Sequence, residues 1–182
     1  MADGNFYVDS RGPFIIADSA ALTLSTANQA LLPLGNLPVL GSNYWWAGKL
    51  VRIRMFGRIT SASSTPGTVT FSLLWGSGAS NVGTPLVSSA AIVLVAAQTN
   101  LSFEMELYVR CRAIGSSGLL LATGKIMFNS AVVAAFVQMM PASAAAPVTV
   151  DLTAANVLSP QVLSSVATDS ITIHEFSLEA MN

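Results

Sequence analysis

The chain has 182 residues and a mass of 18.9 kDa, a size typical of one domain with a single core. Charged residues make up only 9% of it and hydrophobic residues 52%, with a mean hydropathy of +0.61, and this composition excludes general disorder. The formal net charge of -1 excludes the recruitment of nucleic acid or anionic lipid by charge alone. We therefore expect neither nucleic acid nor a membrane as a partner.

The apolar stretches of the chain are interrupted before they reach the roughly 18 residues that a membrane-spanning helix needs. The most apolar stretch, residues 131–146, contains Gln138 and Pro141. The first residues, MADGNFYVDSRGP, lack the basic and apolar regions of a signal peptide, so we expect a soluble, non-secreted product that is made in the cytoplasm. The single cysteine, Cys111, excludes an intrachain disulfide, and no cluster of Cys and His could hold zinc.

Sparse charge also bears on quaternary structure. A lone domain normally covers its exterior with charge, whereas a subunit flanked by neighbours can leave its flanks neutral. We therefore expect a homo-oligomer. The alternative is a monomer whose exterior is rich in Ser, Thr, Ala and Gly.

Residues 1–43 show no sustained hydrophobic period, apart from a short possible strand at 21–25. They contain Pro13, Pro33 and Pro38 beside several apolar clusters. An apolar but aperiodic segment becomes ordered only by lying on something else. We expect an extended N-terminal arm, packed on its own subunit, on a neighbour or on a larger partner. Its expected buried interface residues are Phe6, Phe14 and Ile15.

Residues 44–182 show the strongest pattern of the chain, an alternation of apolar and polar residues with a period of two. It is clearest at 101–113, where the odd positions are apolar, and this predicts a strand with Phe103 and Cys111 in the core. Further strands are predicted at 49–60, 68–75, 86–97, 118–128, 131–140, from 147 onward and from 170 to the end, with helix as the alternative for 131–140.

Turns rich in Gly, Pro and Ser separate these runs, for example at 63–67 and 115–118. About eight strands without a long amphipathic helix predict an all-β fold, an antiparallel jelly-roll β-sandwich formed by residues 44–182. In the last strand the apolar positions change parity between Ile173 and Phe176. A β-bulge near His174 would return both halves to one face. The alternative is a strand that changes its buried side.

The sequence carries no catalytic signature. His174 is the only histidine, and no G-x-S-x-G motif marks a nucleophile. No phosphate-binding loop or calcium loop is present. We expect no enzymatic activity, no catalytic or metal-binding residue and no cofactor.

Two groups of residues are candidate interface residues. The first is a charged stripe on the polar sides of two strands, formed by Arg52, Arg54, Arg58, Glu104, Glu106, Arg110 and Arg112. It would pair across a subunit boundary or form a cross-strand ladder within one chain. The second is Tyr44, Trp45 and Trp46. They would form a sugar-stacking platform, plug the end of the sandwich or anchor an interface.

Several segments together resemble a known group of proteins: NYWWAGK at 43–49 with the strand that follows, the strand at 103–112 with Gly115 and Gly118, VDLT at 150–153, and the ending ITIHEFSLEAMN. They are similar to the jelly-roll head decoration (cement) proteins of tailed bacteriophages, over residues 37–182. The resemblance implies a trimer on the outer surface of a virion that bridges subunits of the phage major capsid protein. Related folds occur in tail and fibre proteins. The expected function is therefore capsid decoration, with a tail or fibre module that binds a host receptor or glycan as the alternative.

Overall fold

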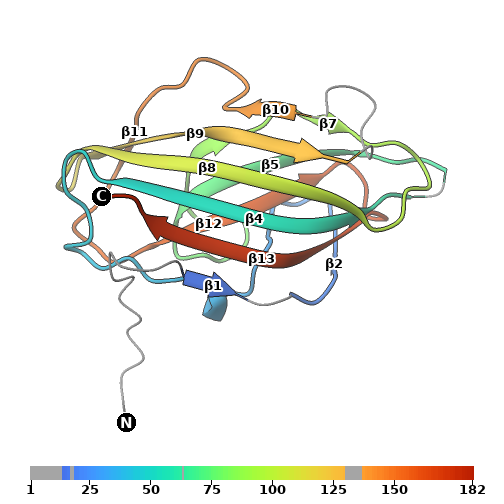
Figure 1. The fold of residues 1–182 in the computed structure, drawn as a ribbon, viewed down its shortest axis with the longest axis horizontal. Coiled ribbons are helices and arrows are strands. Elements are labelled where there is room, and N and C mark those ends of the chain that lie inside the picture. The colour runs from blue at the N-terminus through green and yellow to red at the C-terminus, as the bar shows by residue number, and fades with distance from the viewer. Residues whose placement is uncertain (1–13, 17–18, 63, 130–136) are drawn as a thin grey trace, which may run out of the picture.

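The computed structural model describes residues 14–16, 19–62, 64–129 and 137–182. Within them, two antiparallel sheets pack face to face (Figure 1). The larger sheet has the order β1-β13-β4-β8-β9-β10, with β2 beside β13 and β11 beside β9. Its strands are β1 (Phe14–Ile16), β2 (Leu22–Thr23), β4 (Leu50–Thr60), β8 (Leu101–Ala113), β9 (Gly118–Phe128), β10 (Val137–Met140), β11 (Val148–Val150) and β13 (Ser170–Ala180).

The smaller sheet has the order β3-β12-β5-β6, with β7 beside β5. Its strands are β3 (Gln29–Ala30), β5 (Thr68–Gly76), β6 (Thr84–Ser88), β7 (Ile92–Val93) and β12 (Val157–Ser164), and a short 3₁₀ helix, η1, spans Leu34–Asn36. The predicted all-β antiparallel jelly-roll sandwich is confirmed. No helix of the described residues is long and apolar enough to cross a membrane.

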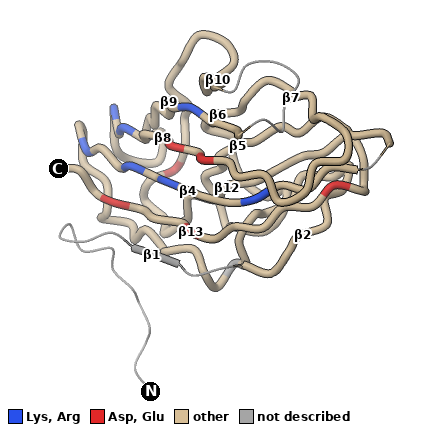
Figure 2. The backbone as a smooth tube through the Cα atoms, turned by 45° about the vertical axis from the view of Figure 1, so that its right-hand side comes forward, with Lys and Arg blue, Asp and Glu red and all other residues tan. Residues whose placement is uncertain are grey.

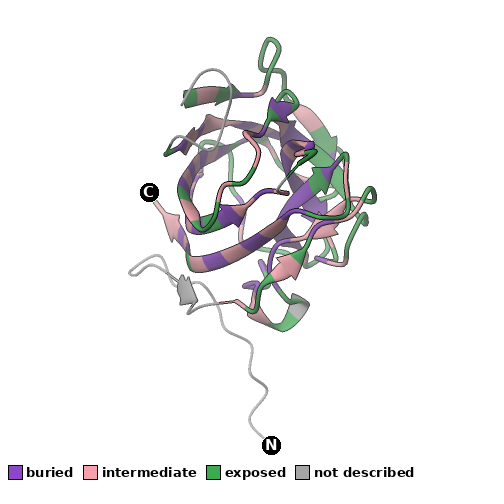
Figure 3. Ribbon diagram, turned by 90° about the vertical axis from the view of Figure 1, so that its right-hand side faces the viewer, coloured by how far each residue is buried: buried purple, intermediate pink, exposed green. Residues whose placement is uncertain are grey.

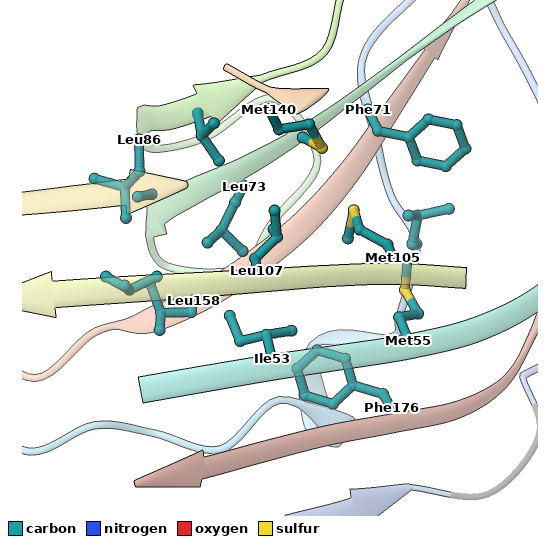
Figure 4. Close-up of a cluster of buried hydrophobic side chains, with 14 of the residues drawn as sticks. Ile53, Met55, Phe71, Leu73, Leu86, Met105, Leu107, Met140, Leu158 and Phe176 are labelled. Atoms are coloured by element: carbon teal, nitrogen blue, oxygen red, sulfur yellow. The ribbon is translucent and has the colours of Figure 1, made fainter. Parts of the chain in front are cut away.

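The core lies between the two sheets, where the alternating side chains of both inner faces meet (Figures 3 and 4). In β8 the predicted register is confirmed. Phe103, Met105, Leu107, Val109 and Cys111 are all buried, while the even positions are exposed or half-buried. Because the side chains of a strand alternate between two faces, this register places the charged residues of β8 on the outer side of the larger sheet.

A β-bulge in β13 settles the alternative left open by the sequence. The pairing of β13 with β4 shifts between Ile173 and Glu175. As a result Ile171 and Ile173 before the bulge, and Phe176 and Leu178 after it, are all buried on the same side. The extra residue restores the parity of the strand, and the bulge prediction is confirmed.

Two predicted strands differ in detail. The segment 86–97 is divided between β6, which begins at Thr84, and β7, and the two lie beside different parts of β5. Of the segment 131–140, residues 137–140 form β10, so strand rather than helix is correct there. Residues 131–136 lie outside the described residues.

Strand β12 was not predicted, because Pro160 stands in its centre and proline argues against an interior strand. The fold accommodates it because β3 is only two residues long and pairs with Gln161 and Val162. Toward β3, Pro160 makes a hydrogen bond only through its carbonyl, which accepts from the backbone N–H of Leu31 at 3.0 Å. The missing N–H of the proline therefore leaves no partner in β3 unsatisfied.

The described part of the segment 1–43 packs on its own subunit. It adds β2 to the larger sheet and β3 to the smaller one. Its leucines belong to the common core: Leu24, Leu31, Leu32, Leu37 and Leu40 are each 5% exposed or less. Phe14 and Ile15 lie in β1, whose backbone pairs with β13 opposite Leu178 and Ser177. The expected burial of their side chains, and the position of Phe6, lie outside the described residues.

Candidate interaction surface

Most charged residues of the described chain lie on strands of the larger sheet (Figure 2), and the parity of these strands places their side chains on its outer face. The basic ones are Arg52, Arg54, Arg58, Arg110, Arg112 and Lys125, and the acidic ones are Glu104, Glu106, Glu175 and Glu179. Six basic and four acidic groups give this face a charge of +2. In contrast, the strands of the smaller sheet contain no Lys, Arg, Asp or Glu. The two sheets therefore present surfaces of different chemistry.

Three ion pairs form a ladder across this face. Arg52 contacts Glu179 with 2.5 Å between Nη2 and Oε2, and Arg54 contacts Glu104 with 3.1 Å between Nη2 and Oε1. Lys125 lies opposite Glu106, with 3.9 Å between Nζ and Oε2.

Because these pairs join β13, β4, β8 and β9 of a single chain, the cross-strand alternative holds for four of the stripe residues, Arg52, Arg54, Glu104 and Glu106. Each pair is partly exposed to solvent, so each contributes about 0.2–1 kcal/mol.

The other three arginines of the stripe differ from these. Arg58, Arg110 and Arg112 are exposed, and none of them has a carboxylate within 4.0 Å among the residues that the structure describes. Arg110 and Arg112 line a shallow hollow of about 370 Å³ at one end of β8. Its other lining residues are Leu50, Tyr108, Leu121 and Thr123.

Of the aromatic residues 44–46, Trp45 is buried in the end of the sandwich and Trp46 is exposed on its surface. Trp45 is 6% exposed and packs edge-on against Tyr44 and Trp75, with ring centroids 5.2 and 5.9 Å apart. Trp75 is itself fixed by a hydrogen bond of 3.0 Å from its Nε1 to the carbonyl of Asp151. Trp45 therefore plugs the end of the sandwich. Trp46, by contrast, is 46% exposed and faces solvent.

Lys49, which was not predicted as a site residue, contacts both Tyr44 and Trp46. Its ammonium lies 3.6 Å from the ring centroid of Tyr44 and 3.9 Å from that of Trp46. Gly48, with φ of +95°, makes the turn that brings the lysine back beneath these rings. Burial lowers the pKa of the Lys49 ammonium below its ordinary value. The two aromatic faces compensate part of the cost of burying this charge.

The burial of Tyr44 makes the free energy of unfolding depend on pH. Burial raises the pKa of its hydroxyl to about 12, against 10.0 for an ordinary tyrosine. Between these values the unfolded chain loses the Tyr44 proton while the folded chain keeps it, so the free energy of unfolding falls as pH rises. We expect Tyr44→Phe to reduce this fall between pH 10.5 and 12, measured by urea denaturation at several pH values. Equal slopes for the two proteins would contradict the burial of the Tyr44 hydroxyl.

The remaining candidate groups do not form a further cluster. Cys111 is fully buried, and burial raises the pKa of its thiol. His174 lies at the bulge of β13. Within the described ranges no three His, Cys, Asp or Glu side chains lie close enough together to hold a metal ion. Two further hollows, of about 420 and 370 Å³, are lined only by neutral residues.

Three residues that complete the ladder were not predicted as site residues: Lys125, Glu179 and Tyr108. Glu106 accepts a hydrogen bond of 3.1 Å from the hydroxyl of Tyr108. The parity of the strand at 118–128 places Lys125 on the polar side, but its partner depends on the turn at 114–117 that sets the register of the hairpin. The face on which Glu179 lies can be assigned only once the bulge in β13 is known, because the bulge changes the parity of the residues that follow it.

No family model matches this chain, and no curated protein matches it. Similar solved structures include the potassium-bound carbohydrate recognition domain of Emp46p, which is 11% identical over 74% of this chain and 73% of that one, with a TM-score of 0.36. Lectin I-B4 from Griffonia simplicifolia is 9% identical over 98% and 97%, with a TM-score of 0.34. Alginate lyase A1-II' is 12% identical over 100% and 86%, with a TM-score of 0.33. Similarities at this level carry no argument about ligand or activity.

Proposed function

We propose that this chain is a non-enzymatic structural protein of a tailed phage virion. As a homotrimer on the outer surface of the capsid, it would bridge and stabilise subunits of the major capsid protein. The resemblance of residues 37–182 to head decoration proteins motivates this proposal. The observation that carries it is the division of the surface into one charged sheet and one neutral sheet, together with the exposed apolar side chains described next.

Nine large hydrophobic side chains of the described residues are 39–65% exposed. Met139 and Val137, at 65% and 50%, lie on the edge strand β10, and Val93, at 51%, lies on β7 of the neutral sheet. Val93 and Leu163 lie on the neutral sheet, whose strands carry no charged residue, whereas β10 is the edge strand of the charged sheet and Met139 lies opposite Lys125. This distribution favours a subunit whose neutral and apolar parts are covered by neighbours.

A repeating shell suits contacts of this kind. Each copy contributes a modest neutral contact, and the lattice multiplies these contacts, because every bound copy links subunits that are already held near one another. A sandwich with one continuous core transmits load between such contacts with little deformation.

Multi-angle light scattering on the purified protein tests the assembly. We expect a mass three times that of the 18.9 kDa chain. Adding the protein to capsids that lack it should raise the temperature at which they rupture, measured by release of packaged DNA. A monodisperse monomer at high concentration, or an unchanged rupture temperature, would count against the proposal.

A second candidate function, binding of a host-surface glycan by a tail or fibre module, is favoured by one observation. Trp46 is half-exposed and has the ammonium of Lys49 against its ring, which fixes an aromatic face at the end of the sandwich. A glycan array distinguishes the two functions. Binding that disappears in Trp46→Ala, with no binding to capsids, would favour the glycan-binding module over the decoration protein.

A further inference from the structure

The hollow at Arg110 and Arg112 has a geometry that matches an extended chain. The two arginines are two residues apart on β8 and line the same hollow, and the pairing of β8 with β9 shifts at Arg112, between Cys111 and Ala113. At a rise of about 3.4 Å per residue in a regular strand, and less at a bulge, their Cα atoms are at most about 7 Å apart. Alternate side chains of an extended polypeptide have this same spacing.

The charges of these two arginines are not balanced within the described chain. Glu104, Glu106 and Glu179 are already engaged by other basic side chains. Glu175 lies opposite Phe56, whereas Arg110 lies opposite Leu50, six residues earlier on β4. This separation is about 20 Å along the sheet, beyond the reach of a side chain.

The apolar part of the lining fits a polypeptide as well. Leu50 and Leu121 flank Arg110 from the two neighbouring strands, and the register places both directly opposite it. Such side chains contact the methylene groups of a bound Glu, while the guanidinium groups hold its carboxylate in a fork geometry. Thr123 adds a hydroxyl to the lining.

We propose that this hollow binds an extended acidic segment of a partner protein, with two carboxylate side chains two residues apart, one on each arginine. The inference rests on the proposed function and names the chemistry by which the partner is recognised. The face carries +2, so the same faces of two copies of this chain would repel each other, and the charge of this face is complementary to an acidic segment. The ladder shows the same recognition within the chain, since Arg54 binds Glu104 of the adjacent strand.

Binding of a synthetic peptide tests the site. The probe is a capped peptide of alternating Thr and Glu, and its matched control replaces each Glu with Gln. We expect chemical-shift changes in NMR spectra at the β8 end for the Glu peptide only. Affinity should fall about tenfold in Arg110→Ala and in Arg112→Ala, and it should fall further as salt is raised.

Arg58→Ala is the matched control variant. Arg58 is an exposed arginine of the same sheet face without a carboxylate partner among the described residues, but it does not line the hollow. Its removal should leave peptide affinity unchanged. Equal losses for all three variants, or equal binding of the Gln peptide, would overturn the proposed site. Tighter binding of an oligogalacturonate of equal charge would also overturn it, in favour of an acidic saccharide.

Capsid binding separates this inference from the proposed function. Wild-type protein and the Arg110→Ala, Arg112→Ala double variant are each added to capsids that lack the protein. If only the wild type binds, the acidic segment belongs to the capsid protein, as expected. If both bind equally, the hollow is not the recognition site. If neither binds while the wild type still takes up the Glu peptide, the capsid function is wrong and the peptide site stands.

Discussion

Gly124→Ala is expected to cost more than about 4 kcal/mol of the free energy of unfolding, because no space exists for its Cβ. Gly124 lies in β9 opposite Leu107 of β8. A Cβ built there would collide with the carbonyl oxygen of Glu106 and would come within 2.8 Å of the Cα of Leu107. Both are backbone atoms, so they move only if β8 and β9 separate. Urea denaturation measures the loss.

The matched control is Gly41→Ala. A Cβ at Gly41 would meet no atom within 4 Å, and its φ is not in the left-handed region. Its stability should therefore stay the same or rise by up to about 1 kcal/mol, because alanine restricts the unfolded chain. Similar unfolding midpoints for the two variants would contradict the close approach of the strands at Gly124.

Phe103→Ala is expected to cost about 3–5 kcal/mol, the range for a fully buried phenylalanine. Phe103 is 3% exposed, and its ring lies 5.4 Å from that of Phe71 and 5.8 Å from that of Phe128, measured between centroids. Truncation would leave a cavity where three rings from both sheets now meet. Thermal and urea denaturation would measure the loss.

Phe56→Ala provides the comparison for this prediction. Phe56 belongs to the adjacent strand β4, but its side chain is half-buried on the outer face beneath Arg54, whose guanidinium lies 5.1 Å from the ring centroid. Removing it creates no internal cavity, so the loss should be about 1 kcal/mol. Equal losses at the two positions would show that the faces of these strands have been assigned wrongly.

The long strands were predictable because one of their faces is buried and the other is not. In β8 and β4 this difference appears directly as alternation. In β13 the change of parity between Ile173 and Phe176 left two alternatives, a bulge or a change of the buried side, and the structure has the bulge. Burial on a single face is the physical condition under which a period of two carries information.

The prediction failed where both faces of a strand are covered or where the chain is irregular. In β12, Ser159 and Gln161 are fully buried on the outer side, because Gln161 bonds the backbone of Ala79 and Asn81 in the loop that folds over it. Such a strand loses the alternation by which it would be recognised. The core leucines of residues 24–40 follow the path of a loop rather than a period, so no pattern marks which of them are buried.

The pairing of the candidate site residues was not predictable either. Polar parity places a residue on the outer face, but which arginine meets which glutamate depends on strand order and register. In this chain β4 lies between β13 and β8, although 109 residues separate β4 from β13. Arg52 and Glu179 meet only because of this long-range pairing.

For a protein that binds an acidic surface, as proposed here, charge gathered on one sheet would act differently on the association rate and on the dissociation rate. With a net charge of -1 the molecule feels little overall attraction, but its uneven charge acts as a dipole that turns the arginine-bearing sheet toward an acidic surface during diffusion. This steering weakens as salt screens it, so the association rate falls with ionic strength. A contact made by the neutral sheet would involve no charge, so salt would change its contribution to the dissociation rate little, whereas the contribution of the arginine contacts would weaken as salt is raised.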